Sequence, residues 1–193
     1  MIKKTRAIIV LIMTLSGANL MFGTPTESEM GSEYQVKAAF LYNFVKFVDW
    51  PAKSVPDGNE PMTIGIIGDD PFGKAFEPLK NKLVKDKKIV LKRFKGLNEL
   101  KQSSQQIEDI KICHLLFVCR SEKELFKEII NLVKDRPVLT IADTEGFLES
   151  GGIINFLMEE KKIRFEINHT AAKQAKLRIS SKLLRLAKNS DYR

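Results

Sequence analysis

Short apolar runs alternate along this chain with segments of helical periodicity, and that alternation limits the folds it can adopt. The apolar runs that predict strands lie at residues 62–67, 88–94, 112–119 and 138–142. Helical patterns precede and separate them at 33–49, 74–82, 98–107 and 122–134. Such alternation is typical of a mainly parallel sheet with helices on both faces. We therefore expect an α/β fold.

The last forty residues depart from this alternation. Apolar runs at 153–158 and 163–167 flank four charged residues, and this pattern predicts a C-terminal antiparallel hairpin. Asn168 or Thr170 then caps a final helical region that ends near Lys188.

Two serines are expected to cap earlier helices. Ser32 precedes the helical pattern at 33–49. Ser121 precedes the pattern at 122–134, where Glu124 completes a capping box.

The N-terminus has the features of an export signal. Lys3, Lys4 and Arg6 precede an apolar run at 7–15, and the small residues at 16–18 follow it. Cleavage after Ala18 fits best, and a cut near Gly23 is the alternative. A membrane-spanning helix needs about 20 apolar residues, so a cleaved signal is favoured over an uncleaved anchor. No cysteine lies near the cut, which excludes a lipoprotein anchor.

The remaining chain has the length of one domain. Residues 1–18 are predicted to be the signal peptide, 19–32 a flexible lead-in, and 33–190 a single α/β domain. The formal net charge is +8, but the bases are spread along the chain and mixed with acids. A periplasmic location follows from export, and nucleic acid is not an expected partner.

Two cysteines, Cys113 and Cys119, lie in the most apolar predicted strand. Six residues of extended chain span about 20 Å, whereas a disulfide requires Cα atoms within about 7 Å. We therefore expect the two thiols to stay unlinked within one molecule. Burial as apolar side chains explains them most simply, and an intermolecular bridge through Cys119 is the alternative.

None of the patterns that carry chemistry in enzymes is well formed. Gly65, Gly68 and Gly73 lack the order of a phosphate-binding loop. His114 and His169 are the two histidines, and they lie in different predicted elements without metal-ligand spacing. We expect no metal, no cofactor and no catalytic residue.

Carboxylates follow two of the predicted strands. Asp69 or Asp70 could approach Asp143 or Glu145, because ligands in open α/β sheets lie outside the carboxyl ends of strands. Caps and turns explain the same acids equally well, and the crevice remains a candidate for a small polar ligand.

A second ligand site is predicted on the hairpin. Arg164 and Glu166 are two residues apart in a strand and project to one side, and His169 follows shortly after. These three residues are our candidate ligand-binding set. A structural contact between Arg164 and Glu166 is the alternative.

Several segments together resemble one protein family. The chain is similar to the YfiR-like (YfiR/HmsC-type) periplasmic regulators at 33–44 (EYQVKAAFLYNF), 50–51 (WP), 151–156 (GGIINF), 164–168 (RFEIN), 171–172 (AA) and 180–187 (SSKLLRLA). The resemblance implies a compact α/β domain in the periplasm, without enzyme activity. It also implies a protein that restrains a membrane-bound diguanylate cyclase through the cyclase's periplasmic portion, and so controls cyclic-di-GMP and biofilm formation.

The resemblance leaves other properties open. Better-known members of the family use disulfides for stability, and the two cysteines here are expected not to pair, so redox control does not carry over. A small-ligand sensor or solute-binding accessory protein is the alternative function, and a homodimer is an open alternative for the assembly.

Overall fold

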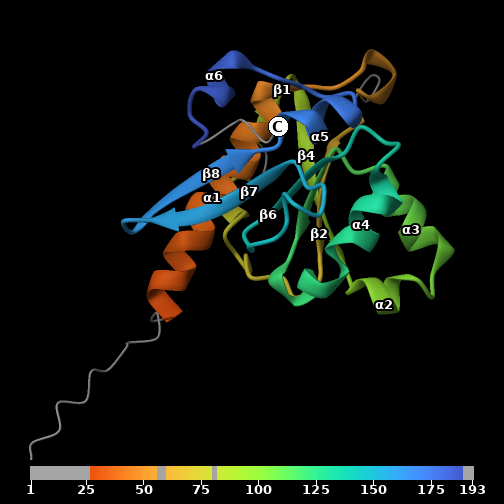
Figure 1. Ribbon diagram of the computed structural model, residues 1–193, viewed down its shortest axis with the longest axis horizontal. Helices are drawn as coiled ribbons and strands as arrows, with labels where there is room; N and C mark the ends of the chain where they lie inside the picture. The colour runs from red at the N-terminus through yellow and green to blue at the C-terminus, as the bar shows by residue number, and fades with distance from the viewer. Residues whose placement is uncertain (1–26, 56–59, 80–81, 189–193) are drawn as a thin grey trace, which may run out of the picture.

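The computed structural model describes residues 27–55, 60–79 and 82–188. The predicted signal peptide and its cleavage site lie outside these ranges. The centre is a seven-stranded sheet in the order β3-β4-β2-β5-β6-β7-β8 (Figure 1). The strands are β2 (Met62–Ile67), β3 (Leu83–Val84), β4 (Lys87–Phe94), β5 (Leu115–Val118), β6 (Leu139–Ala142), β7 (Ile154–Glu159) and β8 (Lys162–Ile167). A separate two-stranded sheet pairs β1 (Val48–Asp49) with β9 (Arg178–Ile179).

The predicted α/β class and the mainly parallel pairing are confirmed. The four pairs β2–β4, β2–β5, β5–β6 and β6–β7 are parallel, and β7–β8 is antiparallel. The short β3–β4 hairpin was not predicted. Both hairpins turn through two non-glycine residues with positive φ, Lys85-Asp86 and Glu160-Lys161. This is the geometry of a tight turn whose twist matches that of the strands.

The helices differ more from expectation than the strands do. They are α1 (Glu27–Phe47), α2 (Leu97–Leu100), α3 (Ser104–Lys111), α4 (Phe126–Val133), α5 (His169–Gln174) and α6 (Ser181–Leu184), with short 3-10 turns η1 (Ala52–Ser54), η2 (Glu77–Leu79) and η3 (Arg120–Leu125). Among the described residues, no helix is long and apolar enough to cross a membrane.

Expected helix boundaries are wrong in all five predicted helical regions, and the region at 122–134 is described with the site. The first helix begins at Glu27, so Ser32 is not its cap. In the described part of the expected helix at 74–82, the helical element is the 3-10 turn η2, and the expected helix at 98–107 is split into α2 and α3. In the last helical region, β9 separates α5 from α6, although Asn168 does cap α5 by accepting a hydrogen bond from the Ala171 amide.

Side chains of β5 alternate between two apolar cores, one on each face of the sheet. Leu115 and Phe117 belong to the core that includes α1, whereas Leu116 and Val118 belong to the core that includes α4. The α1 core is strongly aromatic, and its rings at positions 40, 44, 156 and 165 stand 5.0–5.8 Å apart. Each buried phenylalanine contributes about 1.5–3 kcal/mol of transfer free energy, so the hairpin and α1 are held firmly together.

The two cysteines belong to different cores. Cys113 lies with the α4 core and Cys119 with the α1 core, and both are buried free thiols. Burial raises the pKa of the Cys113 thiol to about 12, and burial also raises the pKa of Cys119. The expected strand at 112–119 was too long, because β5 spans only Leu115–Val118 and both cysteines lie just outside it. The thiols are unlinked, as expected, but they are separated by lying in cores on opposite faces of the sheet.

Candidate functional site

The parallel strand order defines the place where ligands bind in many α/β sheets. The chain passes from β2 to β4 on one side and then crosses back to β5 on the other. Such a reversal opens a crevice outside the carboxyl ends of the two central strands. In this chain the segments that follow β2 and β5, at 68–70 and 119–122, lie at that crevice.

Side chains of the protein itself fill this crevice. The Ser121 hydroxyl accepts a hydrogen bond from the Asp69 amide at 3.0 Å, and a Cβ added to Gly68 would lie 2.4 Å from that hydroxyl oxygen. Glu122 is buried, and its carboxylate accepts a hydrogen bond at 2.9 Å from the amide of Leu97, at the start of α2. A carboxylate therefore occupies the position at which an anionic ligand would meet a helix N-terminus.

This arrangement corrects the expected capping box at Ser121. Residues 120–125 form the 3-10 turn η3, and α4 begins only at Phe126 without a side-chain cap. The Ser121 hydroxyl instead accepts a hydrogen bond from the Asp69 amide, in the loop after β2. The glycine at position 68 has φ +95°, so it provides a tight turn and close contact.

Two of the four carboxylates expected near the strand ends make structural contacts. Asp70 accepts a hydrogen bond from the Phe72 amide and forms an ion pair with Arg93 at 2.6 Å. Asp143, at the end of β6, accepts hydrogen bonds from Tyr34 at 2.8 Å and from Lys37 at 2.5 Å.

The contacts of Asp143 tie α1 to the sheet. The side chains of Lys37 and Asp143 are 6% and 3% exposed, and Lys37 also pairs with Glu33 at 2.5 Å. The Lys37 ammonium stands 4.4 Å from the centre of the Tyr34 ring. Burial, together with the neighbouring Asp143 carboxylate, raises the pKa of Tyr34, so this hydroxyl stays protonated and donates. The network fixes the position of α1 at the carboxyl end of the sheet.

The three residues of the predicted ligand set have different surroundings. Arg164 is exposed on β8, and His169 is the first residue of α5. Glu166 is partly buried and lines a cavity of about 290 Å³, and burial together with Glu149 raises its pKa. The other acidic residues that line this cavity are Asp143, Glu145 and Glu149.

His114 is a structural residue at the opposite, amino end of the sheet. Its Nδ1 accepts a hydrogen bond from the Thr63 amide at 3.1 Å, which leaves Nε2 as the donor to the Ser54 carbonyl at 3.1 Å. Burial lowers the pKa of this imidazole, so the neutral form is favoured. Within the described ranges, no three His, Cys, Asp or Glu side chains gather into a metal-binding group.

Comparison with known proteins agrees with this architecture. The profile of the YfiR/HmsC-like family matches residues 34–188. The chain belongs to this family. Among curated proteins, no sequence matches the chain.

The fold recurs in a solved structure of a conserved domain protein from Vibrio cholerae O1 biovar eltor. That protein is 12% identical, with a TM-score of 0.56 over 80% of this chain, and the likeness concerns the fold alone. This chain corresponds to 59% of the length of that one.

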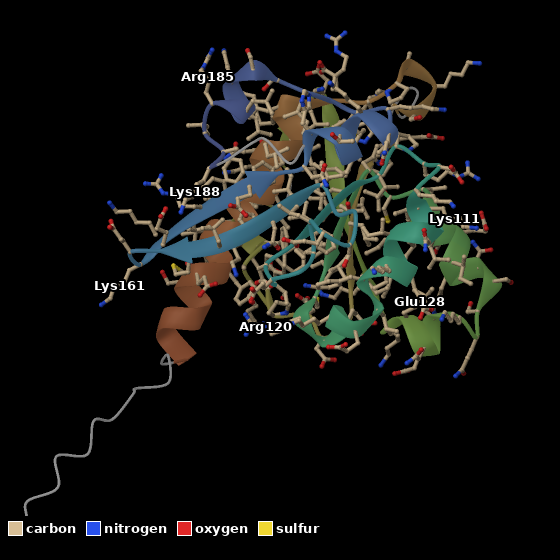
Figure 2. All side chains as sticks on the ribbon, in the orientation of Figure 1. Lys111, Arg120, Glu128, Lys161, Arg185 and Lys188 are labelled. Carbon is tan, nitrogen blue, oxygen red and sulfur yellow. The ribbon has the colours of Figure 1, made fainter. Side chains whose placement is uncertain are left out.

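In the YfiR/HmsC-like domain α1 crosses the β7–β8 hairpin (Figure 1). Both elements carry exposed apolar side chains. Val36 is 45% exposed and lies one helical turn from Phe40, which packs on the hairpin. Met158 is 52% exposed, and its register partner Ile163 is partly buried. We call these four residues the hairpin face. Lys161 projects from the tip of the same hairpin (Figure 2).

Sequence reasoning missed a second cavity, which has a volume of about 540 Å³ and lies beside the β1–β9 pair. Its walls are Asp49, Trp50, Pro51, Val55, Lys85, Lys176 and Arg178. These residues come from four separate segments, brought together by the pairing of Val48–Asp49 with Arg178–Ile179. A cluster of two lysines and an arginine around the single tryptophan is not visible in the linear sequence.

Proposed function

We propose that this chain is a periplasmic, non-enzymatic regulator that binds the periplasmic portion of a membrane-bound diguanylate cyclase and restrains it. Lower cyclic-di-GMP and less biofilm would follow. The observation that carries the proposal is the match to the YfiR/HmsC-like family, which extends across residues 34–188. The filled crevice at the strand reversal supports a role in binding another protein, because the usual small-ligand position is taken by Glu122.

The hairpin face is the proposed contact surface. Specific protein interfaces centre on apolar anchors surrounded by a polar rim. Val36 and Met158 supply exposed apolar anchors, and the charged turn residues Glu160 and Lys161 border them. The partly buried Phe40 continues the apolar surface into the core.

The structure under the hairpin face suits a rigid docking surface. Phe40 packs against both strands of the hairpin, with ring centres 5.8 Å from Phe156 and 5.7 Å from Phe165. The buried Lys37–Asp143 pair fixes α1 one turn away. A surface that is already ordered before binding loses little conformational entropy on association.

The test combines genetics with binding. Deletion of the gene is expected to raise cellular cyclic-di-GMP, and the rise should disappear when the membrane cyclase is deleted as well. A purified periplasmic portion of that cyclase should bind the wild-type protein in a calorimeter. An unchanged cyclic-di-GMP level across growth conditions would refute the proposal.

A matched pair of variants locates the surface. Met158→Asp is expected to weaken cyclase binding at least about tenfold, because a charge would enter the centre of an apolar contact. Ile112→Asp is the control, since Ile112 is 61% exposed and lies at the amino end of the sheet, far from the hairpin in sequence and fold. Equal affinities for both variants would exclude the hairpin face.

A small-ligand sensor is the second candidate function, and the cavity beside Glu166 favours it. Asp143 is already paired with Lys37, so the carboxylates of Glu145, Glu149 and Glu166 would select a ligand with an amino group. Thermal unfolding with putrescine and spermidine tests this, with Arg164→Ala and Glu166→Gln as variants. A stabilisation that Glu166→Gln abolishes would support the sensor, and equal shifts in all proteins would discard this site.

A further inference from the structure

The apolar surface of α1 is wider than its contact with the sheet. Between Tyr34 and Phe47 the polar residues are Gln35, Lys37, Asn43 and Lys46, and all others are apolar or aromatic. Ala38 and Leu41 are fully buried, whereas Val36 is 45% exposed. A helix with so broad an apolar surface can bury several parts of it about equally well. Hydrophobicity alone therefore does not select the side of α1 that faces the sheet.

Lys37 is the charged residue on the buried side of this segment. The other three polar residues of the segment are exposed, but Lys37 is only 5% exposed. Lysine is almost never buried unless its charge is paired, and a buried ion pair adds little net stability compared with apolar residues of similar volume. Stability therefore does not account for a lysine at this position.

The contacts of Lys37 have defined directions. Its Nζ lies 2.5 Å from carboxylate oxygens of both Asp143 and Glu33. The Asp143 carboxylate also accepts hydrogen bonds from the hydroxyls of Tyr34 at 2.8 Å and Thr144 at 3.4 Å. Hydrogen bonds weaken steeply when they are misaligned, whereas apolar contacts have no direction. A buried polar network whose members are all paired therefore specifies one arrangement of the groups that carry it.

The network lies in the N-terminal half of α1, and backbone contacts hold the other end of the helix. β1 follows α1 directly and pairs with β9, and the Phe47 carbonyl accepts a hydrogen bond from the Ser180 amide at 2.9 Å. Lys37 lies about 15 Å further along the helix toward its N-terminus. At that distance the rotation of α1 about its axis depends on side-chain contacts, and the network supplies contacts that have a direction.

The rotation of α1 decides which side chains the hairpin face presents. Successive residues of a helix are about 100° apart around its axis, so a Lys37 side chain turned toward Asp143 directs Val36 away from the sheet. Phe40, on the turn after Lys37, packs on the hairpin. We propose that Lys37 and Asp143 are positioning residues, whose buried contact selects the rotation of α1 that leaves Val36 on the surface and Phe40 on the hairpin. The rotation is a property of this chain alone, whereas its effect on docking rests on the proposed regulatory function.

Cysteine labelling measures the rotation in the full mature protein. Val36→Cys should react rapidly with N-ethylmaleimide and Ala38→Cys slowly, because Val36 is 45% exposed and Ala38 is fully buried. The two native cysteines are buried as well. Lys37→Met combined with Asp143→Leu replaces the network by apolar groups and should keep a cooperative thermal transition. In this background the ratio of the two labelling rates is expected to fall about tenfold, which corresponds to about 1.4 kcal/mol of lost preference.

Asp143→Asn separates positioning from stability. Its amide oxygen can still accept hydrogen bonds from Tyr34 and Lys37, so this variant should keep the wild-type labelling ratio although its melting temperature falls. A purely structural role predicts the reverse, because the labelling ratio would then follow the melting temperature. Lys101→Met combined with Glu128→Leu, at an exposed ion pair of 2.5 Å, is the matched control and should also keep the ratio.

Calorimetry with the periplasmic portion of the cyclase tests the effect on docking. The double variant of Lys37 and Asp143 is expected to bind about tenfold more weakly than wild type, because the competent rotation is then only a fraction of the population. If this variant lacks a cooperative transition, Asp143→Leu alone replaces it, since Lys37 then keeps its ion pair with Glu33.

The two measurements fail in different ways. The absence of binding by wild type would refute the regulatory function, and the labelling ratio would then decide the positioning role. An unchanged labelling ratio, or a wild-type affinity in a variant whose ratio has fallen, would overturn the proposal.

Discussion

Different kinds of polar group lie at the two ends of the parallel sheet. At the carboxyl end, charged groups meet inside the protein: Lys37 and Tyr34 bind Asp143, and Glu122 binds the backbone of α2. At the amino end, neutral His114 bridges two backbone groups, and the donor of Trp50 lacks an acceptor.

The difference reverses the usual expectation for this kind of sheet. Ligands normally lie outside the carboxyl ends of the strands, yet in this chain that end is occupied by internal ion pairs and by a carboxylate of the protein. The spare donors and the cationic cavity are at the other end, beside Trp50. At the strand reversal the carboxyl end is therefore structural, and the acidic cavity beside Glu166 is the candidate ligand site at this end. The amino end has a buried donor without an acceptor.

Lys37→Met tests the carboxyl end with the largest expected effect. The variant leaves the buried Asp143 carboxylate without its cation, so the free energy of unfolding should fall by about 3–5 kcal/mol. Urea denaturation measures the loss. Lys37→Met combined with Asp143→Leu should recover most of it, because the pair is then replaced by apolar groups. A loss below about 1 kcal/mol in the single variant would show that the network does not anchor α1.

Tyr34→Phe is expected to have the next largest effect. It removes a hydrogen bond to a charged acceptor, which contributes about 1.5–3 kcal/mol. Tyr42→Phe is a matched control, because the Tyr42 hydroxyl donates at 3.0 Å to the Leu83 carbonyl in an exposed setting. The control should lose no more than about 1 kcal/mol. Equal losses in chemical denaturation would mean that burial of Asp143 adds nothing to this contact.

The strands of this chain could be read from its sequence more reliably than its helices. The run at 62–67 matches β2 residue for residue, because a buried strand needs continuous apolar residues. The final helical region was broken by β9, whose two residues pair with Val48–Asp49, about 130 positions away. A two-residue strand has no periodicity of its own, so only tertiary contact defines it.

The polar sites, too, depend on tertiary contacts that the sequence does not reveal. The Asp143 network joins residues more than a hundred positions apart, and the sequence suggested only that Asp143 follows a strand. Ser121 has the local pattern of a helix cap, but the amide of Asp69 competes for its hydroxyl. Of the predicted ligand residues, the sequence placed Glu166 correctly on a strand, yet nothing local indicated the acidic neighbours around it.

Glu122→Gln tests whether the negative charge of Glu122, or only the space that its side chain fills, excludes anions from the crevice. The amide oxygen can still accept from the Leu97 amide, so the variant loses only the charge-assisted part of the bond. We expect a loss of about 1 kcal/mol in the free energy of unfolding. Inorganic phosphate should stabilise this variant no more than wild type, because the side chain still fills the crevice. A phosphate-dependent rise in melting temperature would show that charge alone excludes anions there.

The smallest effect is expected at the amino end, from the pH dependence of His114. Burial holds the pKa of this imidazole below its ordinary value of about 6.5. The unfolded chain therefore binds a proton more readily than the folded one. Stability is complete above about pH 6.5 and falls as the pH drops through that value toward the folded-state pKa, with a slope of at most about 1.4 kcal/mol per pH unit.

A variant of His114 tests that slope. Denaturation of His114→Gln between about pH 7.5 and about pH 5.5 should show a flatter dependence than wild type, whatever its absolute stability. If His114→Gln keeps the wild-type slope, the neutral bridge that His114 forms between Thr63 and Ser54 does not set the pH dependence of the amino end.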